Sequence, residues 1–130
     1  MAIIGSLLKR GITLRESLEQ QFSSASDLQK QELKKLLIKA RNTKFGKTYN
    51  FIEILKSFRH EPGNTYYDRF CDEVPIYDYD SMYNNWWVHA REGKEDVCWP
   101  GKIKYFALSS GTSGATSKYI PITKDIFKSM

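Results

Sequence analysis

The stretch that most restricts how this chain can fold is a run of nine small residues, Ser109 to Ser117, that contains only Ser, Gly, Thr and Ala. Segments rich in Ile, Tyr and Phe flank it, residues 102–108 before it and residues 118–122 after it. Such segments predict β-strands, and a slack tether between two strands would loosen their pairing. The run is therefore predicted to be a loop that joins two strands and binds a ligand.

The composition of this loop suits a polyphosphate ligand. Gly111 and Gly114 let the backbone approach a ligand closely, and successive backbone N–H groups can form a concave site for an anion. Lys118 adds a positive charge at the far end, and no Asp or Glu occurs between Val97 and Lys124. The candidate phosphate-binding residues are Ser109, Ser110, Gly111, Thr112, Ser113, Gly114 and Lys118. Their spacing fits neither of the common nucleotide-binding patterns, G-x-x-x-x-G-K-[ST] and G-x-G-x-x-G.

Helices are predicted for most of the chain before residue 61. Apolar residues at helical spacing predict one or two amphipathic helices within residues 3–22. Ser26 and Gln29 fit a capping box at the start of the next helix, and Gly46 is predicted to end that helix. The residues expected on its buried face are Leu33, Leu36, Leu37 and Ala40.

A shorter helix is predicted after Asn50, which repeats the capping pattern together with Glu53. It must end before the turn signal Glu-Pro-Gly-Asn at residues 61–64. The apolar residues that it carries are Ile52, Leu55 and Phe58. Residues 66–76 are less regular, and Pro75 favours extended backbone at the residue before it.

Another helix is predicted to begin with Asp80 as its N-cap and to end at Gly93. The residues expected on one side of it are Met82, Trp86, His89 and Ala90. Residues 99–101, Trp-Pro-Gly, predict a turn before the first strand. After the second strand, Thr123 is expected to cap a helix that begins at Lys124.

The predicted fold class is α+β, with N-terminal helices followed by the first strands of a larger α/β sandwich. Residues 1–60 are expected to be mostly helical, and residues 61–130 to form a helix plus the strand-loop-strand unit. Because two adjacent strands alone are marginal in water, we expect residues 1–130 to be the N-terminal part of a larger domain. On its own the chain would then expose apolar surface and could oligomerise.

Charge, cysteines and hydropathy restrict the partners. The net charge of +5 permits an anionic ligand without requiring one, and Lys and Glu are interspersed, so nucleic acid is not the expected partner. No apolar run approaches the roughly 20 residues that span a bilayer, and no membrane partner is expected. Cys71 and Cys98 are expected to be free thiols in a reducing compartment, which places the chain in the cytoplasm.

Other residues that could take part in chemistry are predicted to have structural roles. Asp78 and Asp80 suit turn and cap positions better than a catalytic carboxylate pair. His89 and Trp86 are expected to be packing residues on the apolar side of their helix, with Trp87 at an edge. The loop at residues 109–118 is therefore the one candidate site that the residues support.

The stretch Ser109-Ser110-Gly111-Thr112-Ser113, followed by Lys118, resembles the first ATP motif of adenylate-forming enzymes. Among these, the chain is most similar to the auxin-responsive promoter (Gretchen Hagen) family of acyl acid amido synthetases. Residues 43–46 (Thr-Lys-Phe-Gly), 74–76 (Val-Pro-Ile) and 99–101 (Trp-Pro-Gly) also fit the front of that family. Ala115 stands where the family commonly has glycine, which indicates a divergent branch.

The resemblance implies an ATP-dependent ligase. In such enzymes a carboxylic acid attacks the α-phosphate of ATP, pyrophosphate leaves, and an amine or amino acid then takes the acyl group. By this resemblance, Ser110, Gly111, Thr112 and Ser113 would grip the β- and γ-phosphates, Lys118 would help to neutralise them, and Mg²⁺ would bridge the same oxygens. None of these residues would act as a nucleophile or a base, and no protein metal ligand is expected among them.

Two alternatives remain open at the level of the sequence. One is a stand-alone basic helical module that binds nucleic acid or a protein partner. The other is a protein that lies on a membrane surface through the amphipathic residues near its N-terminus.

Overall fold

The computed structural model of this chain describes residues 25–60, 65–110 and 116–129. The helices predicted within residues 3–22 lie outside this part. The chain divides into two units, residues 1–35 and residues 36–130, and the contacts described below all lie within the second unit except where α2 continues into the first.

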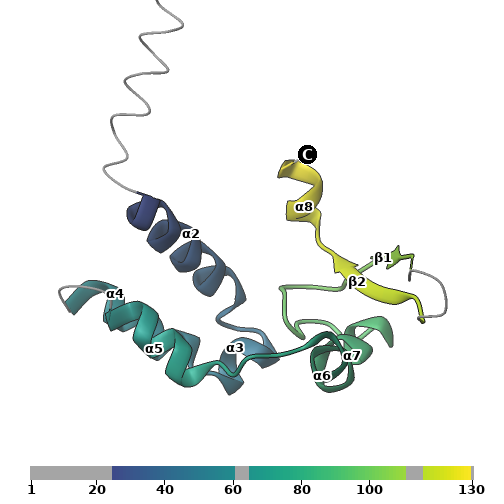
Figure 1. Cartoon of the computed structure of the whole chain (residues 1–130), viewed down its shortest axis with the longest axis horizontal. Coiled ribbons are helices and arrows are strands. Elements are labelled where there is room, and N and C mark those ends of the chain that lie inside the picture. The colour runs from purple at the N-terminus through teal and green to yellow at the C-terminus, as the bar shows by residue number, and fades with distance from the viewer. Residues whose placement is uncertain (1–24, 61–64, 111–115, 130) are drawn as a thin grey trace, which may run out of the picture. The chain divides into compact units, whose positions relative to one another are not determined.

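Helices come first and a two-stranded antiparallel sheet lies near the C-terminal end, which confirms the predicted α+β class (Figure 1). The described elements are α2 (Ala25–Ala40), α3 (Lys44–Thr48), α4 (Phe51–His60), α5 (Thr65–Glu73), α6 (Tyr79–Met82), the π-helical turn η1 (Tyr83–Trp87), α7 (Val88–Arg91), β1 (Tyr105–Ser109), β2 (Lys118–Ile122) and α8 (Lys124–Ser129).

The predicted second helix is α2, but its ends and its buried face differ from the prediction. Ser26 lies inside the helix, so it is not the N-cap of a capping box. Leu37 and Ala40 are buried as expected, whereas Leu36 is 51% exposed and was wrongly assigned to the buried face. The helix stops at Ala40, six residues before the predicted stop at Gly46.

The joint between α2 and α3 is built by Thr43, which is 1% exposed. Its hydroxyl donates to the carbonyl of Ala40 at 2.7 Å and accepts the backbone N–H of Gly46 at 3.0 Å. Gly46 lies inside α3, where a Cβ atom would come 2.1 Å from the Ala40 carbonyl oxygen. Glycine is needed at this position for close packing, and it does not end the preceding helix.

A cluster of aromatic rings connects α3 and the start of α4 with η1. Phe45 is at its centre, 4.7 Å from the Tyr49 ring and 4.9 Å from the Trp86 ring between centroids.

The first two N–H groups of α3 are satisfied by distant backbone, because Lys44 and Phe45 donate to the carbonyls of residues 96 and 97 at 2.8 and 2.9 Å. The core residues are Leu37, Ala40, Phe51, Ile54, Tyr66, Ala90 and Val97.

α4 and α5 lie side by side. α4 runs through His60, as the turn signal after it predicted. The predicted capping box is wrong, because Asn50 has a φ of 52° and its side-chain amide donates to Glu73 at 3.2 Å. α5 was not predicted as a helix. Its Tyr66 is buried against Phe58 of α4, with ring centroids 4.7 Å apart.

The helix predicted from Asp80 to Gly93 is present as α6, η1 and α7, but its N-cap is Asp78. The Asp78 carboxylate accepts the backbone N–H of Ser81 at 2.8 Å. Gly93 ends the segment as predicted, with a φ of 90°. The N–H groups of Gly93 and Lys94 donate to the carbonyls of Ala90 and His89, the paired bonds of a Schellman motif.

The two predicted strands are present, but the first runs from Tyr105 to Ser109 rather than over residues 102–108. β2 has the predicted bounds, and α8 begins at Lys124 as expected. The turn at residues 99–101 is also present, with a φ of 80° at Gly101. The strands pair from Tyr105 with Ile122 to Ser109 with Lys118. Since directly paired residues share a face of the sheet, Ser109 and Lys118 lie side by side where the loop begins and ends.

Candidate anion-binding site

The two ends of the predicted phosphate loop are held together by the sheet. Ser109 is the last residue of β1 and Lys118 the first of β2, and they form the terminal pair of the antiparallel ladder. Ser110 follows β1 directly and is exposed. The other predicted site residues, Gly111, Thr112, Ser113 and Gly114, lie outside the described residues. Of the predicted set, the structure therefore brings together Ser109, Ser110 and Lys118.

The beginning of β2 is attached to α6 by the side chain of Tyr79. The backbone N–H of Tyr119 donates to the Tyr79 hydroxyl oxygen at 2.7 Å. The same hydroxyl lies 3.4 Å from the Tyr119 carbonyl oxygen, a long separation for a hydrogen bond between oxygens. Residue 119 is thus held through its backbone N–H by a side chain 40 residues earlier in the chain, and its carbonyl oxygen lies near the same hydroxyl.

The Lys118 ammonium lies over the ring of the same tyrosine. Its Nζ atom is 5.0 Å from the centroid of the Tyr79 ring, within the range of a cation–π interaction. Asp78 is also near: hydrogen bonding from Ser81 lowers the pKa of the Asp78 carboxyl, and the positive charge of Lys118 lowers it further. The sequence contains no acidic residue around the loop, yet the fold brings one close to its lysine.

Arg91 of α7 is attached to the same strand. Its guanidinium carbon lies 3.7 Å from the centroid of the Tyr119 ring, and its Nη1 donates to the Tyr83 hydroxyl at 2.8 Å. That hydrogen bond raises the pKa of the Arg91 guanidinium above its usual value. Tyr83 in turn stacks on Tyr79, with centroids 5.8 Å apart. We call the five residues of this closed ring of contacts the brace: Tyr79, Tyr83, Arg91, Lys118 and Tyr119.

Sequence reasoning identified Lys118 in the brace but missed its other members. The residue types in the loop are a local signal, whereas Tyr79 and Tyr119 are separated by 40 positions with no pattern that links them. Tyr79 and Tyr83 lie four residues apart, a spacing typical of side chains that pack on one face of a helix, and this spacing does not indicate a contact with a distant strand.

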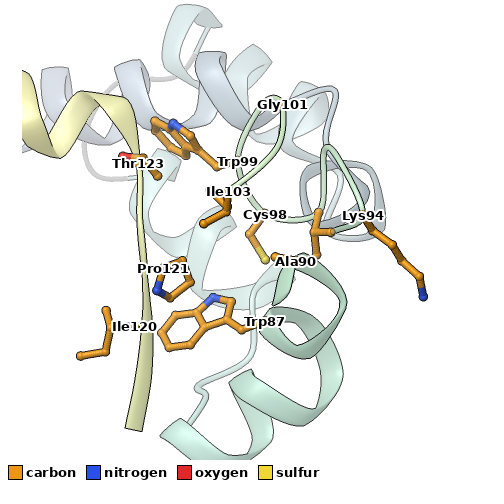
Figure 2. A pocket seen from close by; sticks show the side chains of 11 residues that line it. Trp87, Ala90, Lys94, Cys98, Trp99, Gly101, Ile103, Ile120, Pro121 and Thr123 are labelled. Atoms are coloured by element: carbon orange, nitrogen blue, oxygen red, sulfur yellow. The ribbon is translucent and has the colours of Figure 1, made fainter. Parts of the chain in front are cut away.

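An apolar cavity of about 180 Å³ lies between α7 and β2 (Figure 2). Trp87 and Ala90 line it from the helical side, and Ile120 and Pro121 from the strand. Lys94 extends away from it. The Cys98 thiol also borders the cavity, and burial raises its pKa to about 12. This cavity suits an apolar group and offers no charge for a phosphate.

A second hollow, of about 410 Å³, is basic. Its carboxylate, Asp125, forms an ion pair with Lys39 at 2.6 Å and accepts the indole N–H of Trp99 at 3.1 Å, and the Lys39 contact lowers the pKa of this carboxyl. The lysines that line it are Lys39, Lys102, Lys104, Lys124 and Lys128. It lies beside the hairpin and shares none of the residues of the brace.

The other residues considered from the sequence have structural contacts. His89 is partly exposed and lies 3.4 Å from Glu92 and 3.1 Å from the Lys94 ammonium. Trp86 donates its indole N–H to the Tyr77 hydroxyl at 3.0 Å. Within the described ranges, no three His, Cys, Asp or Glu side chains are grouped as metal ligands would be. The helices in that same part of the chain are too short or too polar to cross a bilayer.

Comparison with protein families gives a match over most of the chain. The model of the GH3 family N-terminal domain matches residues 14–130. Comparison with curated proteins and with solved structures finds no match.

Proposed function

The chain belongs to the GH3 family of auxin-responsive acyl acid amido synthetases, and from this premise we propose that it forms the ATP phosphate-binding part of a ligase. The reaction would join a carboxylic acid to an amine or an amino acid. In the first step a carboxylate oxygen bonds to the α-phosphorus of ATP, and the bond to pyrophosphate breaks. In the second step the amine attacks the acyl carbon, and AMP leaves.

The proposed phosphate ligands are the backbone and hydroxyl groups of the loop, together with the lysine that follows it. They are Ser109, Ser110, Gly111, Thr112, Ser113, Gly114 and Lys118. The observation that supports the proposal is the terminal strand pair between Ser109 and Lys118, because it brings the first and the last residue of the predicted phosphate-binding set side by side. Donors held in place before the reaction stabilise charge without reorganising, which is how such a loop would contribute.

Mg²⁺ would supply further positive charge at the phosphate oxygens, and hydroxyl and phosphate oxygens are ligands that it prefers. The chain's own part in catalysis is to bind and orient the β- and γ-phosphates so that pyrophosphate can leave. No residue of the loop is assigned a nucleophilic or basic role.

The experiment that tests this proposal uses the complete protein that contains these residues. Lys118→Ala and Thr112→Ala should each lower carboxylate-dependent release of pyrophosphate by about a hundredfold, the usual effect of removing a donor that stabilises developing charge. Lys104→Ala is the matched control, because Lys104 is an exposed lysine just before β1 and outside the loop. Turnover of the Lys118→Ala protein at the wild-type rate would refute the assigned role.

A further inference from the structure

We propose that Tyr79 is a positioning residue that holds Lys118 in place for phosphate binding. This inference rests on the proposed function, since it assigns Tyr79 a purpose in the same site. Tyr79 makes two separate contacts at the end of the loop: one to the Lys118 ammonium through its ring, and one to the backbone of the next residue through its hydroxyl.

The hydroxyl of Tyr79 lies where a further strand would pair with β2. In the two-stranded sheet, the side of β2 that does not face β1 presents backbone N–H and C=O groups with no ladder partner. The Tyr79 hydroxyl occupies that side at residue 119, where it accepts the N–H at 2.7 Å. The backbone one residue after Lys118 is therefore fixed from both sides, by β1 and by Tyr79.

The ring contact restricts the lysine side chain. Lysine has a flexible four-carbon stem, and ordering such a side chain when a ligand binds opposes binding. With its Nζ atom over the Tyr79 ring and its charge near Asp78, Lys118 is already directed toward α6 before any phosphate arrives. The Lys118 side chain would then lose less conformational entropy when a phosphate binds.

Tyr79 is itself held by the rest of the brace. It stacks on Tyr83, whose hydroxyl accepts a hydrogen bond from Arg91, and Arg91 lies against the Tyr119 ring. A ring that only filled space would need none of these polar contacts. A Tyr79→Phe substitution distinguishes positioning from packing, because phenylalanine keeps the ring but lacks the hydroxyl that accepts the N–H of Tyr119.

The test is Tyr79→Phe in the complete protein. The KM for ATP should rise about fivefold, the factor that corresponds to one lost hydrogen bond, while kcat and the KM for the carboxylic acid stay within about twofold. Hydrogen exchange at the Tyr119 amide should become faster, because its acceptor has gone. Tyr105→Phe is the matched control, since Tyr105 lies at the other end of the hairpin and contacts Phe127.

The same change in a Lys118→Ala background distinguishes the two proposals. If Tyr79 acts through Lys118, its effect on the KM for ATP should fall below about twofold there, because residues that act as a unit are not additive. An undiminished effect in that background, or an unchanged KM in the single variant, overturns the positioning role and leaves the proposed function intact. A Lys118→Ala protein with full activity overturns both.

If Tyr79→Phe does not fold, Arg91→Gln tests the brace from its other end. It removes the cation over Tyr119 and the donor to Tyr83, and it leaves Tyr79 and Lys118 in place. It should raise the KM for ATP in the same direction, again only when Lys118 is present. No change in that KM would count against the inference.

Discussion

At the scale of single residues, the two cysteines show how the surroundings of a thiol determine its reactivity. Both are free thiols, as the sequence predicted. Cys71 is exposed on α5, whereas Cys98 borders the apolar cavity, and burial raises its pKa to about 12. A thiol reacts as its thiolate, so the surroundings of Cys98 suppress the reactive form as well as access to it.

We therefore expect iodoacetamide at pH 8 to modify Cys71 rapidly and Cys98 slowly. With a pKa near 12, only about one Cys98 in ten thousand is ionised at this pH. Mass spectrometry of the time course checks this, with Cys71→Ser as the control in which only the slow phase remains. Equal rates for the two cysteines would contradict the burial of Cys98.

Residue types near the loop could be predicted from the sequence, and the partners of those residues could not. Serine, threonine and glycine in one run are a local pattern with a direct chemical meaning. Tyr79 and Asp78 join the site only because the helix that begins at α6 lies against β2. Such a contact depends on the packing of segments far apart in the sequence, which the order of residues does not encode locally.

At the scale of elements, helix ends depend on tertiary contacts more than on local signals. The joint between α2 and α3 is the clearest example, because Thr43 satisfies groups on both helices while Gly46 packs against the carbonyl of Ala40. Glycine signals a helix stop in many sequences, and that interpretation failed at Gly46. At Gly93 the same signal was correct, because there the φ of 90° disfavours any side chain.

Gly46→Ala should destabilise the protein by about 3 kcal/mol, since the added carbon would overlap backbone that cannot move aside easily. Gly101→Ala is the matched control: no atom lies within 4 Å of its Cβ position, so only its φ of 80° resists the change, at about 1 kcal/mol. Urea unfolding of both variants checks the order. A larger loss for Gly101→Ala would contradict the packing assigned to Gly46.

The two strands and α8 were predicted well because segments rich in Ile, Tyr and Phe and a threonine before Lys124 are local signals. α5 was missed for the opposite reason. Its stability as a helix comes from the burial of Tyr66 against Phe58, and short helices depend on such packing more than on intrinsic propensity. The N-cap was placed at Asp80 instead of Asp78 because either aspartate satisfies the sequence rule.

At the scale of the whole molecule, large apolar side chains are exposed at several places along the described chain, and three of them lie on the two-stranded sheet formed by β1 and β2. Tyr105 and Ile120, which are 63 and 41% exposed, lie on one face of this sheet, and Leu108, which is 61% exposed, lies on the other. A sheet of this size has little apolar contact of its own to hold it. Both faces of the sheet are therefore expected to associate with other protein when they are not covered.

We expect the 130-residue chain on its own to self-associate through the exposed apolar residues on the two faces of this sheet. Its mass in solution, measured by light scattering after gel filtration, should increase with protein concentration. Leu108→Asp should shift the chain toward the monomer, because burying a carboxylate in such a contact is unfavourable. Thr116→Asp adds the same charge at an exposed polar position nearby and should have little effect. A monomer at every concentration would refute the expectation.

The π-helical turn η1 determines which side of α7 lies against β2. An α-helix advances about 100° per residue, and a π turn contains about one residue more than an α turn. Loss of one residue from Tyr83–Trp87 would restore ordinary winding and rotate α7 by roughly that angle, carrying Arg91 away from the tyrosine on β2. The extra residue of η1 thus sets the rotation of α7 about the helix axis relative to α6. A chain of this family that lacked it would have to contact the strand with a different side chain.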